Sequence, residues 1–145
     1  MYKHILIATD GSELSERAVR AGIDLAKAVG AKVTLLTASV HFHIFETNAS
    51  AITATRDSYA SDCEKRASER FSAGQKYAQA AGVKAVPLHV YSDHPFQAII
   101  DEAAKNGCDL VVMASHGRSG VAGVLLGSET TKVLTHSKVP VLVCR

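Results

Sequence analysis

Apolar positions along the chain alternate between short runs rich in β-branched residues and longer stretches with a helical spacing. Five short runs predict strands, at residues 4–9, 33–38, 84–91, 109–115 and 139–144. Four stretches with apolar residues three and four positions apart predict helices, at about 13–29, 54–81, 95–105 and 129–136. Strands that alternate with helices predict an α/β domain, with a parallel sheet covered by helices on both faces.

Several positions predict where these elements end or lie. Ser12 can cap the first helix, and Gly30 stands where that helix should stop. Pro87 cannot donate a ladder hydrogen bond, so its strand should lie at an edge of the sheet. The run at 109–115 lacks polar alternation, which predicts a central strand with both faces buried. Gly74 falls on the inner face of the second helix, where it marks either a close contact with the sheet or a break in the helix.

Length and charge narrow the classes of protein. A chain of 145 residues predicts one domain over residues 1–145, and the scattered Lys and Arg with a net charge of +2 argue against nucleic-acid binding. No apolar run approaches the roughly 18 residues of a membrane span, and no secretory signal opens the sequence, so we expect a cytoplasmic protein. The three cysteines form no CxxC pair, which favours thiols in a reducing compartment over a zinc or redox site.

Two loops carry the candidate chemistry. The first, at residues 9–12, follows the first strand and contains Asp10. The second, at residues 115–128, follows the fourth strand and contains four glycines: Gly117, Gly120, Gly123 and Gly127. Ligands of doubly wound sheets bind outside the carboxyl ends of the strands, where the strand order reverses. Both loops would open into one crevice if the first and fourth strands were neighbours, which the order along the chain does not establish.

The glycine loop is compatible with a phosphate site. Glycines adopt positive φ easily and let backbone N–H groups approach an anion, and Gly127 and Ser128 lead into a helix N-terminus. Arg118 and His116 offer further contacts, although His116 suits a backbone contact equally well. A plain flexible turn explains the glycines as well as a phosphate cradle does. The sequence has no GxGxxG, no GxxxxGK[ST] and no GxSxG motif, which argues against a dinucleotide fingerprint, a P-loop and a hydrolase elbow.

Two segments, at residues 5–12 and 112–143, resemble the universal stress protein family, and the resemblance extends over essentially the whole chain. In the ATP-binding branch of that family the loop reads glycine, two residues, glycine, nine residues, then glycine and a small hydroxyl residue. This chain has Gly117, nine residues, Gly127 and Ser128, with Ala114 in place of the first glycine. The resemblance implies a Rossmann-like, open doubly wound sheet of five parallel strands in the order 3-2-1-4-5, of the adenine nucleotide alpha hydrolase-like kind.

The same resemblance implies a site for an adenine nucleotide. Asp10 would lie near the ribose or a phosphate-bound magnesium ion, and Ala38 would contact adenine through its backbone. The phosphates would be held mostly by main-chain N–H groups, and the Glu129 side chain should point away because its charge repels phosphate. The implied binding residues are Ala8, Thr9, Asp10, Gly11, Ala38, Met113, Ala114, Ser115, His116, Gly117, Arg118, Gly127, Ser128, Glu129 and Thr130.

The resemblance further implies a nucleotide-dependent regulator or sensor of stress that binds ATP, or else AMP or ADP, with magnesium possible. It also implies a homodimer formed through the last strand, Val139–Arg145, whose apolar edge would otherwise be exposed. Two alternatives stay open. One is a slow ATP hydrolase or adenylating enzyme that uses the same loop, and the other is a dimeric interaction module without nucleotide.

The pair His41 and His43 raises the possibility of a metal site. Two imidazoles in an irregular stretch without a carboxylate partner nearby are usually surface residues. We therefore expect no metal there.

Overall fold

The computed structural model describes residues 1–44, 49–117 and 126–145. Its strands and helices alternate along the chain as predicted, and helix α2 begins some five residues earlier than expected. The elements are β1 (His4–Ala8), α1 (Glu13–Val29), β2 (Lys32–Ser39), α2 (Ala49–Ala81), β3 (Ala85–Tyr91), α3 (Pro95–Lys105), β4 (Leu110–Ala114), α4 (Ser128–His136) and β5 (Val141–Cys144). All strand pairs are parallel, and the order is β3-β2-β1-β4-β5, as the family resemblance implied.

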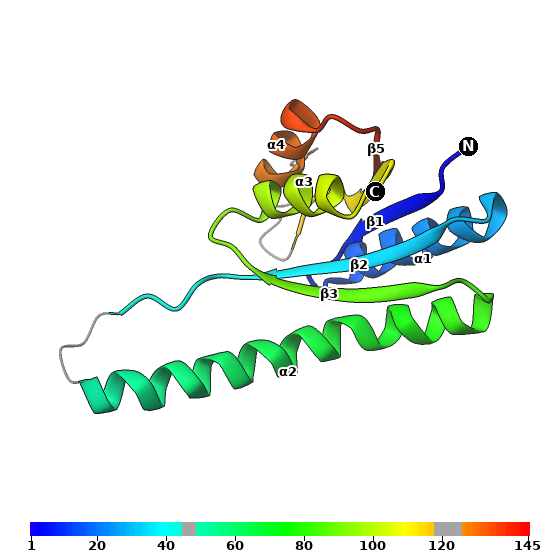
Figure 1. Cartoon of the computed structure of the whole chain (residues 1–145). Helices are drawn as coiled ribbons and strands as arrows, with labels where there is room; N and C mark the ends of the chain where they lie inside the picture. The colour runs from blue at the N-terminus through cyan, green and yellow to red at the C-terminus, as the bar shows by residue number, and fades with distance from the viewer. Residues whose placement is uncertain (45–48, 118–125) are drawn as a thin grey trace.

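Helices cover both faces of the sheet, so the domain has three layers (Figure 1). Side chains alternate across the sheet along β1: Ile5 and Ile7 pack in one buried cluster with residues of α1 and α2. Leu6 points to the opposite face and packs in a second cluster, which contains Ile99 of α3 and Val133 of α4. The apolar runs of the sequence thus become strands that are buried on both faces.

The strand order reverses at β1, which lies between β2 and β4. Ile7 pairs with Leu35 of β2 on one side and with Val112 of β4 on the other. This pairing supplies the adjacency that the order along the chain could not establish. Because parallel strands end at the same edge of the sheet, the loops that follow β1 and β4 leave side by side.

Local signals in the sequence have the predicted effects. The Ser12 hydroxyl accepts a hydrogen bond from the Ser15 N–H at 3.2 Å and caps α1, and Gly30 ends that helix with φ of 70°. Pro87 lies in β3, which is an edge strand, and every residue of β4 is buried. These four predictions are confirmed, because each follows from a single residue type or from a short run of apolar residues.

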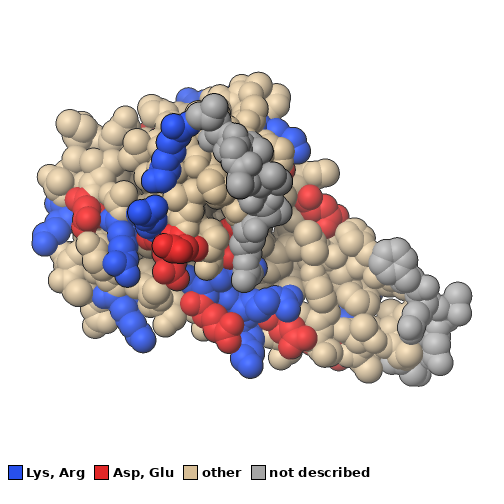
Figure 2. All heavy atoms as spheres, turned by 180° about the vertical axis from the view of Figure 1, so that it is seen from behind, with Lys and Arg blue, Asp and Glu red and all other residues tan. Residues whose placement is uncertain are grey.

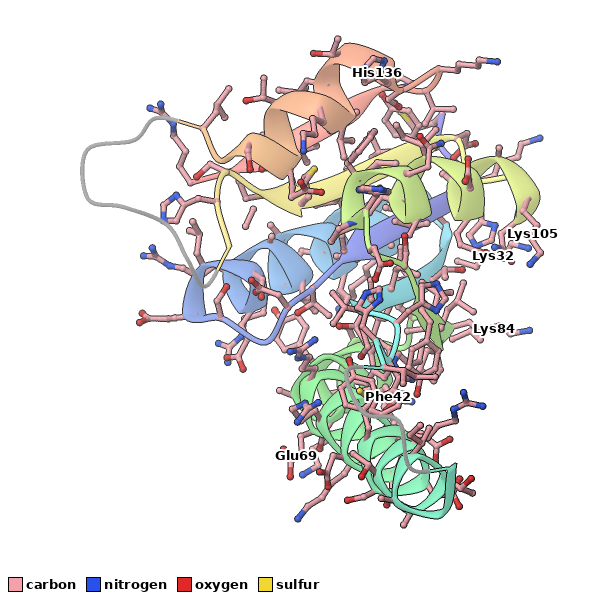
Figure 3. The ribbon with its side chains drawn as sticks, turned by 90° about the vertical axis from the view of Figure 1, so that its left-hand side faces the viewer. Lys32, Phe42, Glu69, Lys84, Lys105 and His136 are labelled. Atoms are coloured by element: carbon pink, nitrogen blue, oxygen red, sulfur yellow. The ribbon has the colours of Figure 1, made fainter. Side chains whose placement is uncertain are left out.

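Helix α2 and the segment that continues β2 run together beyond the sheet (Figure 1). The Tyr59 hydroxyl donates to the Val40 carbonyl at 2.7 Å, and the Phe42 ring lies 5.6 Å from the Tyr59 ring (Figure 3).

His43 Nε2 lies 3.2 Å from Asp93 Oδ1, so the expectation that the pair His41 and His43 lacks a nearby carboxylate is wrong. The sequence could not show this, because the two residues lie fifty positions apart. Within the described residues, no three His, Cys, Asp or Glu side chains cluster as a metal site would require.

Acidic and basic side chains are interspersed on the face opposite to that of Figure 1 (Figure 2). Between α1 and α2, the Tyr77 hydroxyl donates to Asp24 at 3.0 Å, and the Arg20 guanidinium lies 5.6 Å from the Tyr77 ring centre.

Over the described residues, no helix has the length and apolar character that a bilayer span needs.

Gly74 marks a close contact and not a break in the helix, because α2 continues without interruption to Ala81. A Cβ at this position would lie 2.9 Å from Val19 Cγ1 of α1 and 3.3 Å from Leu35 Cδ1 of β2. The missing side chain therefore lets α2 approach both α1 and the sheet.

Gly74→Val should lower the free energy of unfolding by about 1–3 kcal/mol, because the added methyl groups overpack this contact. Its matched control is Ala73→Val, which places the same side chain on the neighbouring exposed position. That control should cost less than about 0.7 kcal/mol, the scale of helix propensity alone. Urea denaturation measures both values, and equal losses would contradict the packing role of Gly74.

Candidate functional site

A cavity of about 500 Å³ opens at the carboxyl ends of β1, β2 and β4, the edge of the sheet that Figure 3 faces. This is the position at which doubly wound sheets bind ligands. The first turns of α3 and α4 complete its wall. The lining residues are Ala8, Thr9, Asp10, Ser15, Leu36, Thr37, Ala38, Pro95, Ile99, Met113, Ala114, His116, Gly117, Gly127, Ser128, Glu129 and Thr130.

Of the described residues predicted from the family resemblance, all but Gly11 and Ser115 line this cavity. Gly11 lies behind it with φ of 77°, where a Cβ would stand 2.8 Å from Arg70 Cγ. Ser115 is buried, and its backbone N–H donates to the Cys144 carbonyl at 2.7 Å. Arg118 lies outside the described residues. The fold thus brings the β1 loop, the end of β2 and the start of α4 together around one space.

Five lining residues were not predicted from the sequence: Ser15, Leu36, Thr37, Pro95 and Ile99. Leu36 and Thr37 directly precede Ala38 on β2, so the end of that strand was a usable signal. Pro95 and Ile99 belong to α3, on which no motif fell. Their position depends on the packing of α3 against the sheet, and that packing cannot be read from the sequence locally.

The loops after β1 and β4 meet at Asp10 and Gly117. Asp10 Oδ1 accepts a hydrogen bond from the Ser12 N–H at 3.0 Å, which fixes the turn. A Cβ on Gly117 would lie only 2.6 Å from Asp10 Oδ2. The absence of a side chain at residue 117 therefore allows the Asp10 carboxylate to reach across to the second loop.

Gly127 allows a second close approach within the same loop. Its N–H donates to the Ser115 carbonyl at 2.7 Å, and a Cβ would lie 3.2 Å from the His116 Cα. Its φ is −69°, and Gly117 also lies outside the left-handed region. The expectation that these glycines supply positive φ is therefore wrong for both. Each glycine is instead required because a Cβ at its position would come too close to a neighbouring atom. Gly120 and Gly123 lie outside the described residues.

Helix α4 is fixed to the end of β4. The Thr130 hydroxyl, which is buried, donates to the Ala114 carbonyl at 3.0 Å. The N-cap of α4 is Gly127, which has no side chain to bond the N–H groups of the first turn. The cavity is therefore lined by a helix N-terminus whose own cap residue offers no side-chain acceptor.

The cavity wall combines an apolar cluster with polar groups. Leu36, Ile99 and Met113 supply apolar surface, while Asp10 and Ser128 supply polar groups. Binding sites for small molecules typically combine an apolar wall with a few placed polar groups in this way. The arrangement suits a ligand with a flat apolar part and an anionic part.

Arg70 connects α2 to the wall of the cavity. Its Nη1 donates to the Thr37 hydroxyl at 3.1 Å, and its aliphatic stem lies against Gly11. His116 contacts the neighbouring Ser115 hydroxyl through Nδ1 at 3.2 Å. One arginine from outside the sheet thus contacts both the end of β2 and the loop after β1.

The Glu129 side chain lines the cavity but turns toward α3. Its Oε2 accepts a hydrogen bond from the Phe96 N–H at 2.8 Å, and Lys132 Nζ lies 3.1 Å from Oε1. The N-cap residue of α3, His94, makes no side-chain cap bond, so Glu129 caps α3 from the neighbouring helix.

Glu129→Ala should lower the free energy of unfolding by about 0.5–2 kcal/mol, the usual loss when a helix N-cap acceptor is removed. Glu129→Gln retains an oxygen that can accept from Phe96 N–H and should lose less. Urea denaturation of the two variants separates the cap from the charge. Equal stability of the alanine variant and the unaltered protein would contradict the capping role.

Comparison with known proteins identifies the family of this chain. The family model described as the universal stress protein family matches residues 1–145. Universal stress protein Rv1636 of Mycobacterium tuberculosis is 32% identical over 142 residues, which cover 98% of this chain and 95% of the relative. The structure of hypothetical protein MJ0577 superimposes with a TM-score of 0.80 at 28% identity, covering 99% of this chain and 96% of that one. A universal stress protein in complex with cAMP superimposes with a TM-score of 0.70 at 27% identity, covering 99% and 97%. The chain therefore belongs to the universal stress protein family.

Proposed function

We propose that the cavity binds an adenine nucleotide, with ATP as the expected ligand, and that the protein is a nucleotide-dependent regulator or sensor of stress. The observation that carries this proposal is the meeting of Asp10 and Gly117 at the strand reversal, beside the N-terminus of α4. The solved relative in complex with cAMP, a ligand with adenine, ribose and phosphate parts, supports the same ligand class.

The apolar and polar residues of the cavity wall suggest how the nucleotide lies. Adenine packs against the apolar wall of Leu36, Ile99 and Met113, beside the backbone of Ala38. The phosphates lie at the first turn of α4, where backbone N–H groups and the partial positive charge of the helix favour an anion. The Ser128 hydroxyl adds a donor there.

Asp10 is the candidate magnesium contact. Magnesium is usually held by one or two carboxylates together with phosphates and water, so a single carboxylate facing a phosphate loop fits a phosphate-bound ion. Asp10 Oδ2 is directed at Gly117, toward that loop. Bound magnesium would neutralise phosphate charge, and Asp10 would hold it beside the ribose end of the ligand.

Rapid turnover is not expected. In the described part of the cavity wall, the carboxylates are Asp10 and Glu129. Glu129 is held by the Phe96 N–H and by Lys132, and a magnesium role for Asp10 would compete with a role as general base. We therefore propose binding as the main activity, with slow hydrolysis of ATP as the most that the site supports.

We further propose a cytoplasmic homodimer. β5 is an edge strand, and Leu142 on it is exposed by 41%. Pairing β5 with a second copy would cover this apolar edge. Three free cysteines, Cys63, Cys108 and Cys144, suit a reducing compartment.

The nucleotide proposal is tested on purified protein. Mass spectrometry of ligand released by denaturation should detect an adenine nucleotide, and calorimetry on emptied protein should show ATP binding. Gly127→Val should abolish binding, because its side chain would meet the His116 backbone beside the phosphate position.

The matched control is Thr135→Val, which puts the same residue at the exposed far end of α4 and should bind normally. A folded, unaltered protein that binds no adenine nucleotide, with or without magnesium, would contradict the proposal and favour an interaction module.

The dimer proposal is tested by sedimentation. Leu142→Arg should convert the dimer to a monomer, because it places a charge in the apolar contact on β5. Val86→Arg makes the same change on the exposed β3 edge, at the other end of the sheet, and should remain a dimer. A monomeric unaltered protein, or dissociation by the β3 variant alone, would overturn the assignment to β5.

A further inference from the structure

Two helix N-termini border the cavity. Pro95 is the first residue of α3 and lines it, and Gly127 and Ser128 line it at the start of α4. A helix N-terminus attracts anions through its unbonded N–H groups and its partial positive charge. The cavity therefore has two places where the anionic part of a ligand could lie.

The N-terminus of α3 is already occupied by a carboxylate of the protein. Glu129 Oε2 accepts from the Phe96 N–H at 2.8 Å, and His94 contributes no side-chain cap. An anion bound at α3 would have to displace this bond and would face the Glu129 charge. The N-cap of α4 is a glycine, and no side-chain cap bond is formed there among the described residues.

The Glu129 charge is only partly offset. Lys132 Nζ lies 3.1 Å from Oε1, in an i,i+3 pair whose Lys and Glu side chains are 47% and 38% exposed. Lys132 also lies 5.2 Å from the Phe96 ring centre. Exposed pairs of this kind interact weakly, because water screens them. A fixed carboxylate thus remains on the wall of the cavity, within the first turn of the helix proposed to hold phosphate.

We propose that Glu129 is a specificity-determining residue, which directs the anionic end of the nucleotide to α4 and disfavours each additional phosphate charge. This inference rests on the proposed function, because it names what the same cavity selects. The Glu129 carboxylate lowers the affinity for a nucleoside triphosphate more than the affinity for a monophosphate. It leaves the affinity for the uncharged nucleoside unchanged. The ratio of ATP affinity to AMP affinity is therefore smaller than it would be without this charge.

Glu129→Gln is the decisive variant, since the amide oxygen can still accept from Phe96 N–H while the charge is lost. Calorimetry without magnesium compares adenosine, AMP and ATP, so that the ligand charge increases in steps. For charges several ångströms apart near a protein surface, we expect ATP to bind about three- to tenfold more tightly. AMP should gain less, and adenosine should change by less than about twofold. The gain for ATP should shrink at high salt.

The matched control is Glu102→Gln. Glu102 forms the corresponding i,i+3 pair with Lys105 near the other end of α3 and does not line the cavity. It should change the affinity for none of the three ligands by more than about twofold. Urea denaturation checks that both variants are folded.

The outcomes separate this inference from the proposed function. An equal gain for all three ligands, no gain for ATP, or an equal gain in the Glu102 variant would overturn the role of Glu129 and leave nucleotide binding intact. If neither the unaltered protein nor the Glu129→Gln variant binds any of the ligands, the proposed function fails and the inference fails with it.

Discussion

The pairing of β1 with β4 is the constraint on which the site depends. It makes β1 the strand at which the sheet order reverses, and it sets the loops after β1 and β4 side by side. Only then can Asp10 reach across to Gly117, where a single added Cβ would meet its carboxylate oxygen. Buried side chains on both faces of both strands hold this pairing. The geometry of the site therefore depends on the packing of the core.

Close packing of backbone, rather than unusual backbone angles, shapes the rest of the cavity. Gly127 lies against the His116 backbone, and Thr130 bonds the Ala114 carbonyl, so α4 starts at the end of β4 with little freedom. Glu129 then extends from this first turn to cap α3. The two helices that border the cavity are thereby joined through a charged side chain on its wall, which connects the stability of α3 to the electrostatics of the ligand site.

The sequence predicted the fold well, because alternating apolar runs, a capping serine and an edge-strand proline each act locally. The order of the strands came from the family resemblance, as did the set of residues around the cavity. Three kinds of feature were missed. Pro95 and Ile99 reach the cavity through helix packing, Asp93 reaches His43 across fifty positions, and the glycines at 117 and 127 serve close approach instead of positive φ. Each depends on distances between segments far apart in the sequence, which a local pattern does not contain.

The nucleotide site is tested most directly by locating the ligand on the protein. Amide chemical shifts of the isotope-labelled protein, recorded during titration with ATP, report which backbone groups meet the nucleotide. We expect the largest shifts at Thr9, Asp10 and Ala38 and at residues 127–130, with small shifts on β3 and along α1. Saturable shifts confined to other surfaces, such as the segment at 40–44 beside α2, would contradict the assignment of this cavity as the nucleotide site.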